Sequence, residues 1–454
     1  MITSRNPHDP ADVIGEWEPA SEADVAAAVD RAAAAAPGWA GTPAPARSAA
    51  LTAAAGALEK RATEVTGLVI REVGKPRSEA AGEVARGVAI LRYFAQAALL
   101  PDGDTLPAAS PGALLMARRR PLGVTGLVTP WNFPVAIPLW KAAPSLAFGN
   151  ATVLKPSEES SGVALLLAEI LGPHLPSGVF QVVPGAGDTG RALTGHAGVA
   201  AVSFTGSVPA GRDVVARAAG RGARVQAEMG GQNASVVLAD ADFDRAATAI
   251  AYAAMGYAGQ KCTATSRIIV EDAAYTKFRD HLAAAVAALG VLDPTQDGTL
   301  VGPVITERAR DSALAAVGAS GGMVLAGGTA LDAAGFYVAP TLVELDAPQG
   351  PLATEEVFAP VAALLRAQDA EDAVRIANGV RYGLVTSLFT QDLSRALRLS
   401  EQFDTGMVRV NAPTSGVDFH APFGGAKQSS YGPREQGLAA RDFYTETRTV
   451  TIVP

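Results

Sequence analysis

The most reactive side chain in the sequence is a single thiol. Cys262 is the only cysteine among 454 residues and lies in the polar stretch AGQKCTATSR at 258–267. A lone cysteine cannot form an internal disulfide, so it is either a small buried filler or a nucleophile. A thiolate can attack a carbonyl carbon near neutral pH and carry the acyl group as a thioester.

Two further segments hold polar groups that such a reaction uses. PWNFP at 130–134 places the amide of Asn132 at the end of a predicted strand, and EMGG at 228–231 places Glu228 beside two glycines. An amide N–H can stabilise an oxyanion, and a carboxylate can act as a general base. Taken singly, Asn132 could be a turn residue and Glu228 a partner in a strand-end ion pair.

Three segments could bind phosphate or ribose. GAGDTG at 185–190 has the dinucleotide-binding spacing G-x-G-x-x-G, but no acidic residue ends a following strand about 20 residues later, so a plain turn explains it equally well. SFTGS at 203–207 ends a predicted strand and begins a helix, where free N–H groups could bind a phosphate or simply be capped. KPSE at 155–158 places Lys155 and Glu158 after another strand.

Other chemistries find little support. GASGG at 318–322 has the spacing of a serine nucleophile elbow, but the preceding segment is helical where an elbow needs a strand, which predicts a loop. The five histidines include no H-x-x-x-H pair, and one cysteine cannot build a thiolate site, so we expect no catalytic metal.

The elements that must position these groups follow an α/β pattern. Short apolar, β-branched runs alternate with helical segments from about 124 to 219, which is typical of a parallel doubly wound sheet. A second series follows Cys262, with strands predicted at 267–271, 323–328 and 361–366. The segment 444–453 alternates like an exposed edge strand.

The Ala-rich first hundred residues read as helices. The segment 21–36 begins at Ser21 as N-cap and should end before Pro37, and helical patterns continue through 47–74 and 78–100. A break rich in Pro, Gly, Asp and Ser follows at 101–112.

Length and charge narrow the class of protein. A chain of 454 residues is too long for one hydrophobic core. A net charge of -8 argues against nucleic acid or an anionic membrane as partner. The N-terminus lacks the apolar region of a signal peptide, and the longest near-apolar stretch, 246–259, is shorter than the ~18 residues a membrane span needs. With a single cysteine, we expect a cytoplasmic protein.

Six motifs occur in one order along the chain, and together they resemble the aldehyde dehydrogenase superfamily over nearly its whole length. They are PWNFP, KPSE, EMGG, GQKC at 259–262, EEVFAP at 355–360 and PFGGAKQSS at 422–430.

The resemblance implies a fold with three parts. A Rossmann-type cofactor domain would comprise 1–100 and 121–229, an α/β catalytic domain 230–430, and a small β oligomerisation segment 101–120 with 435–454. We therefore expect a homodimer or homotetramer. There is little room before NPHDP for the N-terminal hairpin that is usual in the family.

The resemblance also assigns the chemistry. Cys262 is implied as the nucleophile that attacks an aldehyde, Asn132 as the oxyanion donor, and Glu228 as the base that activates water to release the acid from the thioester. The implied cofactor-binding residues are Trp131, Lys155, Glu158, Gly206, Ser207, Gly230, Glu356 and Phe358. The cofactor is NAD or NADP, and NAD is favoured because Glu158 could hydrogen-bond ribose hydroxyls and repel a 2′-phosphate, although Lys155 could attract it.

The substrate is a small aldehyde, and the segments around Glu228, Cys262 and Phe423 are most similar to the sugar-acid branch of the family. That branch oxidises 2-oxoglutarate semialdehyde (2,5-dioxopentanoate) to 2-oxoglutarate. Such a substrate needs a cation for its carboxylate, and Lys261 and His420 are the candidates. The residues expected to form the substrate pocket are Phe133, Ile137, Trp140, Lys261, Thr263, His420 and Phe423.

Alternatives stay open. The apolar members of that pocket would equally suit an aliphatic or aromatic aldehyde or another semialdehyde. A CoA-acylating relative would generally lack the base that Glu228 supplies, and an inactive structural or binding relative need not retain Cys262, Asn132 and Glu356. A cysteine hydrolase would need a histidine motif beside the cysteine, and none accompanies it.

Overall fold

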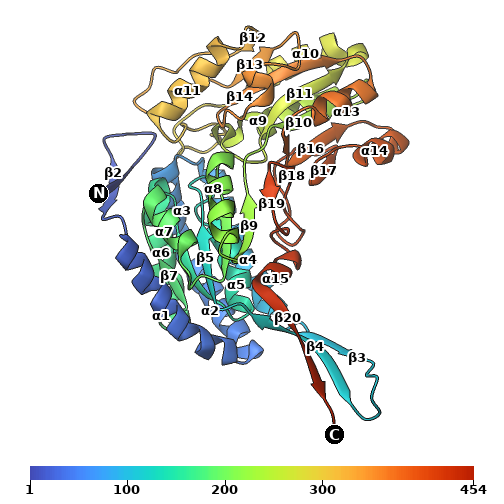
Figure 1. Cartoon of the computed structure of the whole chain (residues 1–454). Helices are drawn as coiled ribbons and strands as arrows, with labels where there is room; N and C mark the ends of the chain where they lie inside the picture. Colours follow the sequence, from blue (N-terminus) through green and yellow to red (C-terminus); the bar gives the residue numbers. More distant parts are fainter.

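The computed structural model describes residues 1–454 as two α/β parts that face each other, with a β arm extending from one of them (Figure 1). The lower part in Figure 1 contains a six-stranded sheet, the upper part a seven-stranded sheet, and the arm a three-stranded sheet. The predicted α/β architecture with parallel sheets is confirmed. No helix combines the length and apolar character needed to cross a membrane.

The six-stranded sheet has the order β19-β9-β8-β5-β6-β7 and is parallel except for the β19–β9 pair. Its strands are β5 (Val124–Val128), β6 (Ala151–Lys155), β7 (Phe180–Val182), β8 (Ala201–Thr205), β9 (Arg224–Glu228) and β19 (Ser430–Tyr431). The central strands are buried along nearly their whole length because helices cover both faces of this sheet.

Alternate residues of each strand enter different cores. On β6, Val153 packs with α1, α7 and α8 on one face, whereas Leu154 packs with α2 to α6 on the other. These helices are α1 (Glu22–Gly41), α2 (Ala44–Lys60), α3 (Ala62–Val73), α4 (Arg77–Ala97), α5 (Ala136–Ala147), α6 (Ser161–Leu171), α7 (Gly187–Gly195) and α8 (Val208–Ala219), with short 3-10 turns η1 (Glu158–Ser160) and η2 (Gly172–His174).

The seven-stranded sheet has the order β12-β13-β14-β11-β10-β16-β17, and only the β12–β13 pair is antiparallel. Its strands are β10 (Asn233–Val237), β11 (Thr265–Glu271), β12 (Met323–Ala326), β13 (Thr341–Glu344), β14 (Val361–Ala367), β16 (Val385–Phe389) and β17 (Met407–Val410). The helices of this part are α9 (Phe243–Met255), η3 (Gly256–Gly259), α10 (Asp272–Ala287), α11 (Glu307–Gly318), α12 (Pro351–Thr354), α13 (Ala370–Asn378) and α14 (Leu393–Ser400). The predicted loop at 318–322 follows the end of α11.

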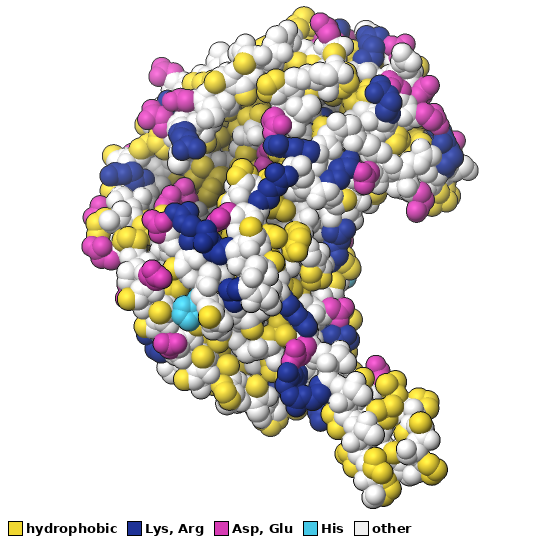
Figure 2. Space-filling view, viewed as in Figure 1, with side chains coloured by type: hydrophobic (Ala, Val, Ile, Leu, Met, Phe, Trp, Pro, Cys, Tyr) yellow, Lys and Arg dark blue, Asp and Glu magenta, His cyan; other side chains and the backbone are white.

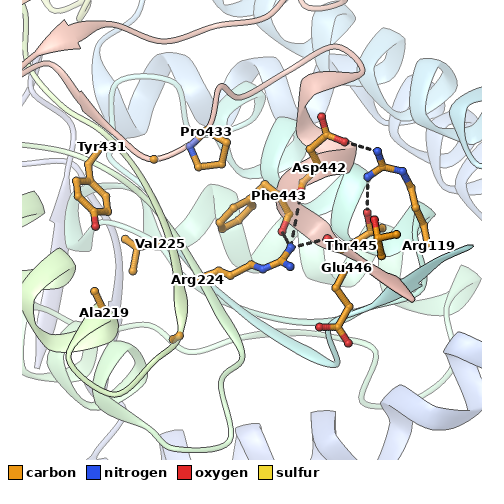
Figure 3. Close-up of a pocket in the computed structure, with 13 residues that line it drawn as sticks. Arg119, Ala219, Arg224, Val225, Tyr431, Pro433, Asp442, Phe443, Thr445 and Glu446 are labelled. Carbon is orange, nitrogen blue, oxygen red and sulfur yellow. Dashed lines mark hydrogen bonds and ion pairs between the residues drawn. The ribbon is translucent and has the colours of Figure 1, made fainter. Parts of the chain in front are cut away.

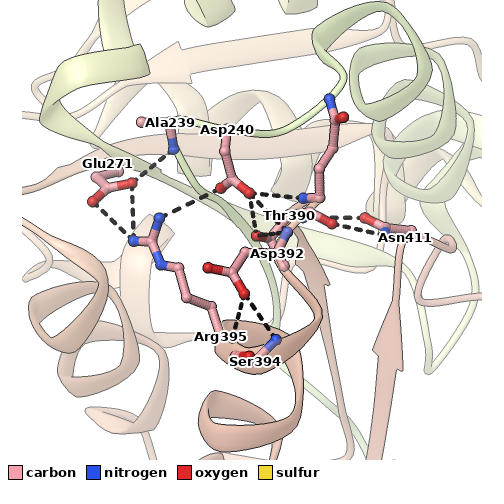
Figure 4. Close-up of polar contacts among 9 residues, drawn as sticks. Ala239, Asp240, Glu271, Thr390, Asp392, Ser394, Arg395 and Asn411 are labelled. Carbon is pink, nitrogen blue, oxygen red and sulfur yellow. Dashed lines mark hydrogen bonds and ion pairs between the residues drawn. The ribbon is translucent and has the colours of Figure 1, made fainter.

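The carboxyl edge of this second sheet is closed by a polar network, which Figure 4 shows. Asp240, just beyond β10, accepts hydrogen bonds from the Thr390 hydroxyl and from the N–H groups of Gln391 and Asp392, just before α14. Arg395 forms ion pairs with Asp240 at 3.4 Å and with Glu271 at 3.2 Å. These charged side chains are therefore paired with one another.

The two sheets instead face each other across a cleft. The carboxyl ends of β5, β6, β8 and β9 lead into it from one side, and the amino ends of β10 and β11 from the other. From β5 the chain continues to β6 and β7 on one side and then crosses back to β8 and β9 on the other side of β5. Ligands of doubly wound sheets bind at such a switch point. Figure 2 shows a hollow between the two parts on this face.

The arm is a three-stranded antiparallel sheet that carries the C-terminus at its tip (Figure 1). It consists of β3 (Gly103–Leu106), β4 (Leu114–Pro121) and β20 (Thr445–Ile452), and α15 (Ala439–Tyr444) joins β20 to the body. The predicted C-terminal edge strand is confirmed, because β20 pairs on one side only. The segment 101–112, expected as a break, contains the short strand β3.

The helix boundaries differ from expectation in two places. α1 does not end before Pro37 but continues to Gly41. Trp39 is buried and its Nε1 donates to the Leu146 carbonyl at 2.9 Å, so tertiary packing maintains the helix despite the hydrogen bond that proline removes. The pattern at 47–74 is interrupted at Arg61, which separates α2 from α3.

An N-terminal β pair is also present. β1 (Ile2–Arg5) and β2 (Val13–Trp17) pair antiparallel, one before and one after NPHDP. The sequence predicted little room for a hairpin before NPHDP. The hairpin uses NPHDP as its turn region and does not precede it. A second small pair, β15 (Tyr382–Gly383) with β18 (Ala426–Lys427), lies near the cleft end of the second sheet.

Candidate active site

Cys262 lies in the turn between η3 and β11, and its side chain is partly exposed. It lines a cavity of about 640 Å³ between the two sheets. Burial and the nearby carboxylates of Glu356, Glu228 and Glu435 raise the pKa of the thiol to about 12. The thiol is therefore protonated at neutral pH in this state.

The backbone before the nucleophile has an unusual conformation. Tyr257, Ala258 and Gly259 have φ values of 54°, 50° and 66°, in the left-handed region. A Cβ on Gly259 would lie 2.2 Å from the carbonyl oxygen of Ala359, so only glycine fits there. Conformations of this kind persist only where surrounding contacts enforce them, and they are frequent at functional sites.

Asn132 follows β5 and is 2% exposed. Its Nδ2 donates to the carbonyl of Gln260 at 2.9 Å, two residues before Cys262. The amide group carries two N–H donors, so one fixes its orientation and the other remains for a ligand. Gln260 is itself held by hydrogen bonds to Pro303 and Ile305. The Asn132 loop and the cysteine turn are thus joined directly.

Glu228 ends β9 and is 2% exposed. It accepts a hydrogen bond from the Ser430 hydroxyl, while its Oε1 has no partner. Burial, with a further contribution from the charge of Glu435, raises its pKa well above the usual range for a carboxyl group. A carboxylate with a raised pKa is a stronger base, as a group that accepts a proton from water requires.

Seven of the eight predicted cofactor residues line the same cavity as Cys262. They are Trp131, Lys155, Gly206, Ser207, Gly230, Glu356 and Phe358. Ser207 is the N-cap of α8 and its side chain makes no capping hydrogen bond, so the N–H groups of this helix are open to a bound phosphate. Glu158 is not among the lining residues but is exposed at the start of η1.

Glu356 and Phe358 close one end of the cavity. Glu356 Oε1 accepts the N–H of Gly231 at 3.0 Å, and burial raises its pKa to about 7. A Cβ on Gly230 would lie 2.1 Å from the carboxylate, which explains the glycine at that position. Phe358, with φ of 57°, packs edge-on against Trp131 with ring centroids 5.8 Å apart.

Lys155 lies at the other end of the cavity. Its Nζ donates to the carbonyl of Gly185 at 2.7 Å, and burial lowers its pKa to about 8. Arg191 of α7 and Asp213 of α8 also line this end. Sequence reasoning missed both, because neither belongs to a recognisable motif. Open helix N–H groups together with cationic and carboxylate side chains fit a dinucleotide.

Of the residues expected in the substrate pocket, only Ile137 lines this cavity. Thr263 is buried beside Cys262, and the ring of Phe133 lies 3.9 Å from the ammonium of Lys75. Trp140 Nε1 donates to Glu435 at 2.8 Å. The Trp140 and Phe423 rings pack together with centroids 5.8 Å apart.

Neither of the two cations expected to bind a substrate carboxylate lines this cavity. Lys261 is 5% exposed, forms an ion pair with Glu79 at 3.3 Å, and lies over the ring of Tyr252. His420 lines a separate groove along α3 and α4. The structure therefore gives Lys261 a bracing contact and gives His420 a surface position.

Helix α4 holds both reactive loops, and sequence reasoning missed this. Glu83 Oε1 accepts the N–H groups of Val135 and Ala136 at 2.8 and 2.9 Å, at the start of α5 and just after the Asn132 loop. Its other oxygen pairs with buried Lys75. Glu79, one turn earlier, pairs with Lys261 beside the nucleophile. The i, i+4 spacing of Glu79 and Glu83 was the only available signal.

A doubly wound sheet whose switch point opens onto a helix N-terminus and a cysteine defines a class: dehydrogenases that use a dinucleotide and a thiol nucleophile. The sequence model of the aldehyde dehydrogenase family matches residues 1–450. The chain belongs to the aldehyde dehydrogenase family, and it is an NAD(P)-dependent enzyme of aldehyde oxidation.

Curated relatives cover the chain from end to end. An alpha-ketoglutaric semialdehyde dehydrogenase of Bacillus subtilis is 40% identical, over 100% of this chain and 95% of the relative. An alpha-ketoglutarate semialdehyde dehydrogenase of Haloferax volcanii is 40% identical, over 98% of this chain and 94% of the relative.

Solved structures share the fold. A putative aldehyde dehydrogenase from Burkholderia cenocepacia superposes with a TM-score of 0.96 at 37% identity, covering 100% of this chain and 95% of that one. PnpE, from Pseudomonas sp., in complex with nicotinamide adenine dinucleotide, superposes with a TM-score of 0.96 at 37% identity, covering 99% and 94%.

Proposed function

We propose that this enzyme oxidises 2-oxoglutarate semialdehyde to 2-oxoglutarate. The observation that carries the proposal is the full-length match, at 40% identity, to semialdehyde dehydrogenases of that name from two organisms. Cys262 and Asn132 line one cavity, and Glu228 is close enough for its charge to act on the thiol, which supports a hydrolytic route to the free acid.

In the proposed mechanism, the Cys262 thiol releases its proton to solvent as substrate binds, and the resulting thiolate attacks the aldehyde carbon. The second N–H of Asn132 and the backbone N–H of Cys262 stabilise the oxyanion of the resulting thiohemiacetal. A nicotinamide held by Glu356 and Phe358 would accept the hydride that this adduct loses when it becomes a thioester. Glu228 then takes a proton from water, the hydroxide attacks the thioester carbonyl, and the acid leaves as the sulfur departs as thiolate.

We propose NAD as the preferred cofactor, with NADP tolerated. The α8 N-terminus with Gly206 and Ser207 would hold the pyrophosphate, and Glu356 and Phe358 would position the nicotinamide end. Lys155 and Glu158 would lie at the adenosine ribose, where an exposed carboxylate disfavours a 2′-phosphate. The ratio of kcat/KM for the two cofactors tests this, and a strong NADP preference would overturn it.

The substrate proposal is tested with a panel of aldehydes followed by NADH absorbance at 340 nm. The panel contains 2-oxoglutarate semialdehyde, succinic semialdehyde, hexanal and benzaldehyde. We expect the highest kcat/KM for 2-oxoglutarate semialdehyde. A preference for hexanal or benzaldehyde would overturn the proposed substrate and leave the family assignment intact. Acyl transfer to CoA in place of hydrolysis would favour the acylating alternative.

We also propose that the cofactor domain comprises 1–100 and 121–229, the catalytic domain 230–430, and an oligomerisation segment 101–120 with 435–454, in a cytoplasmic homo-oligomer. The arm formed by β3, β4 and β20 supports a separate oligomerisation segment. Ion pairs and hydrogen bonds hold its base against the body of the protein (Figure 3). There Arg119 pairs with Asp442 at 2.7 Å, and Arg224 donates to the carbonyls of Phe443 and Thr445. A firmly anchored arm can present its free strands to a second copy.

A further inference from the structure

Most buried cations around the cleft already have partners. Three lysines each pair with a glutamate within 4.0 Å: Lys75, Lys141 and Lys261. Arg434 donates to the carbonyl of Gly425, and its charge acts on Glu228. None of these cations is free to bind the carboxylate of a substrate, and His420 faces a separate groove.

Arg86 of α4 differs from them. It is half-buried, and its Nη1 donates to the carbonyl of Val417 at 2.7 Å. No carboxylate oxygen lies within 4.0 Å of its guanidinium nitrogens. Burial lowers the pKa of its guanidinium, and the charges of Asp418 and Glu83 partly offset that effect. A guanidinium carries five N–H donors, so most of them have no charged partner. A desolvated cation with unused donors is stabilised when an anion binds.

Arg86 reaches a loop that borders the reacting residues. The loop runs from the end of β17 to Phe423, and its Thr414 hydroxyl lies 2.9 Å from that of Thr265, three residues after Cys262. At its other end, Phe423 packs against Trp140 of α5. The Arg86 guanidinium therefore contacts a segment that is fastened to the cysteine turn at one end and to α5 at the other.

The helix that carries Arg86 is also held closely at this level. One turn earlier on α4, Glu83 binds the N–H groups that begin α5, next to the Asn132 loop. A Cβ on Gly87, the next residue, would lie 2.8 Å from Leu139 and 2.9 Å from Val135, so α4 packs tightly on α5 at this level. Arg86 thus lies on α4 between Glu83, which binds the residues that follow the Asn132 loop, and Gly87, which packs on α5.

We propose that Arg86 binds the carboxylate of an aldehyde substrate at the end remote from its reactive carbon, and so selects semialdehydes over uncharged aldehydes. The inference rests on the proposed function of this site. The planar guanidinium can form two parallel hydrogen bonds to a carboxylate, which fixes the orientation of the substrate as well as its charge.

The test compares wild type, Arg86→Gln and Arg86→Lys with 2-oxoglutarate semialdehyde and with hexanal. We expect Arg86→Gln to lower kcat/KM for the semialdehyde about 10- to 100-fold, the range of a lost charge-assisted interaction, and to change kcat/KM for hexanal less than about threefold. Arg86→Lys should retain part of the preference. Arg92→Gln is the matched control, because Arg92 is half exposed on the same helix and pairs with Glu59; it should behave as wild type.

A second measurement does not use the semialdehyde. Glutarate, a dicarboxylate without an aldehyde, should inhibit hexanal oxidation competitively, and about tenfold more weakly in Arg86→Gln. If Arg86→Gln does not fold, Arg86→Lys is compared with wild type in the same assay. Equal losses for both aldehydes, or unchanged glutarate inhibition, would show that Arg86 only fastens the loop and would overturn the inference. A wild-type preference for hexanal would overturn the proposed substrate itself, and these two failures are distinct.

Discussion

The protonated state of the Cys262 thiol sets how it should react. Burial and neighbouring carboxylates raise the pKa of this thiol to about 12. Below that pH, the thiolate fraction rises about tenfold for each pH unit. We predict slow alkylation by iodoacetamide at pH 7 without cofactor, and a rate that rises about tenfold per pH unit up to pH 9. Mass spectrometry measures the labelling, Cys262→Ser is the unlabelled control, and bound NAD should change the rate. A plateau below pH 9 would mean that the thiolate is already formed.

Glu228 should separate the two chemical steps. Glu228→Gln keeps the shape of the side chain but removes the base, so we predict a retained burst of one NADH per active site, followed by turnover reduced about 10²-fold or more. Stopped-flow absorbance at 340 nm measures both phases. Asn132→Ala is the contrasting variant, because loss of an oxyanion donor should slow the burst itself. An absent burst in Glu228→Gln would assign Glu228 to activation of the thiol.

Residues at strand ends were easier to predict than residues with long side chains. Asn132, Gly206 and Ser207 follow parallel strands directly, so the backbone alone carries them to the cleft. Lys261 is adjacent to Cys262 in sequence, yet its ammonium is directed by Glu79, a partner 182 residues away. Nothing local in the sequence encodes that contact, and the same holds for Arg86 and Val417, which are 331 residues apart.

Among the elements, α4 links the halves of the active site. Glu83→Leu should leave Lys75 buried without its counter-ion and loosen the start of α5, where the Asn132 loop ends. We predict a kcat about 10- to 100-fold lower, a KM for NAD within about twofold of wild type, and a lower Tm. Glu59→Gln, at a half-exposed ion pair, is the control.

A double variant distinguishes positioning from stability. A double variant that combines Lys75→Met with Glu83→Leu removes the unpaired charge and should recover much of the Tm. The kcat should remain low, because the carboxylate that holds the N–H groups of Val135 and Ala136 is still missing. Recovery of kcat together with Tm would show that α4 acts only on stability.

The elements themselves were largely predictable from periodicity, whereas their limits and pairings were not. Apolar β-branched runs between helices predicted β5, β6, β8 and β11 because both faces of each are covered. Pro37 suggested a helix end that the burial of Trp39 overrides. β19 has only two residues and joins the first sheet from the far end of the chain, and a two-residue strand carries no pattern.

For the whole molecule, the arm predicts self-association. Leu114 and Ile452 are paired in register on neighbouring strands and are 42% and 53% exposed. We predict a dimer or tetramer by light scattering, and a shift to smaller species when both residues are replaced by Asp. Met323→Asp, at an exposed position on β12, is the control. A monomeric wild-type protein would contradict the prediction.

The lone cysteine also determines how the enzyme should respond to oxidants. No second thiol is present to capture a sulfenic acid as an intramolecular disulfide, so oxidation of Cys262 can proceed to the irreversible sulfinic state unless an external thiol intervenes. Peroxide reacts with the thiolate, and the raised pKa keeps the resting sulfur protonated. Resistance to oxidative inactivation should therefore be greatest in the resting enzyme and decrease during turnover, when the sulfur is repeatedly released as thiolate.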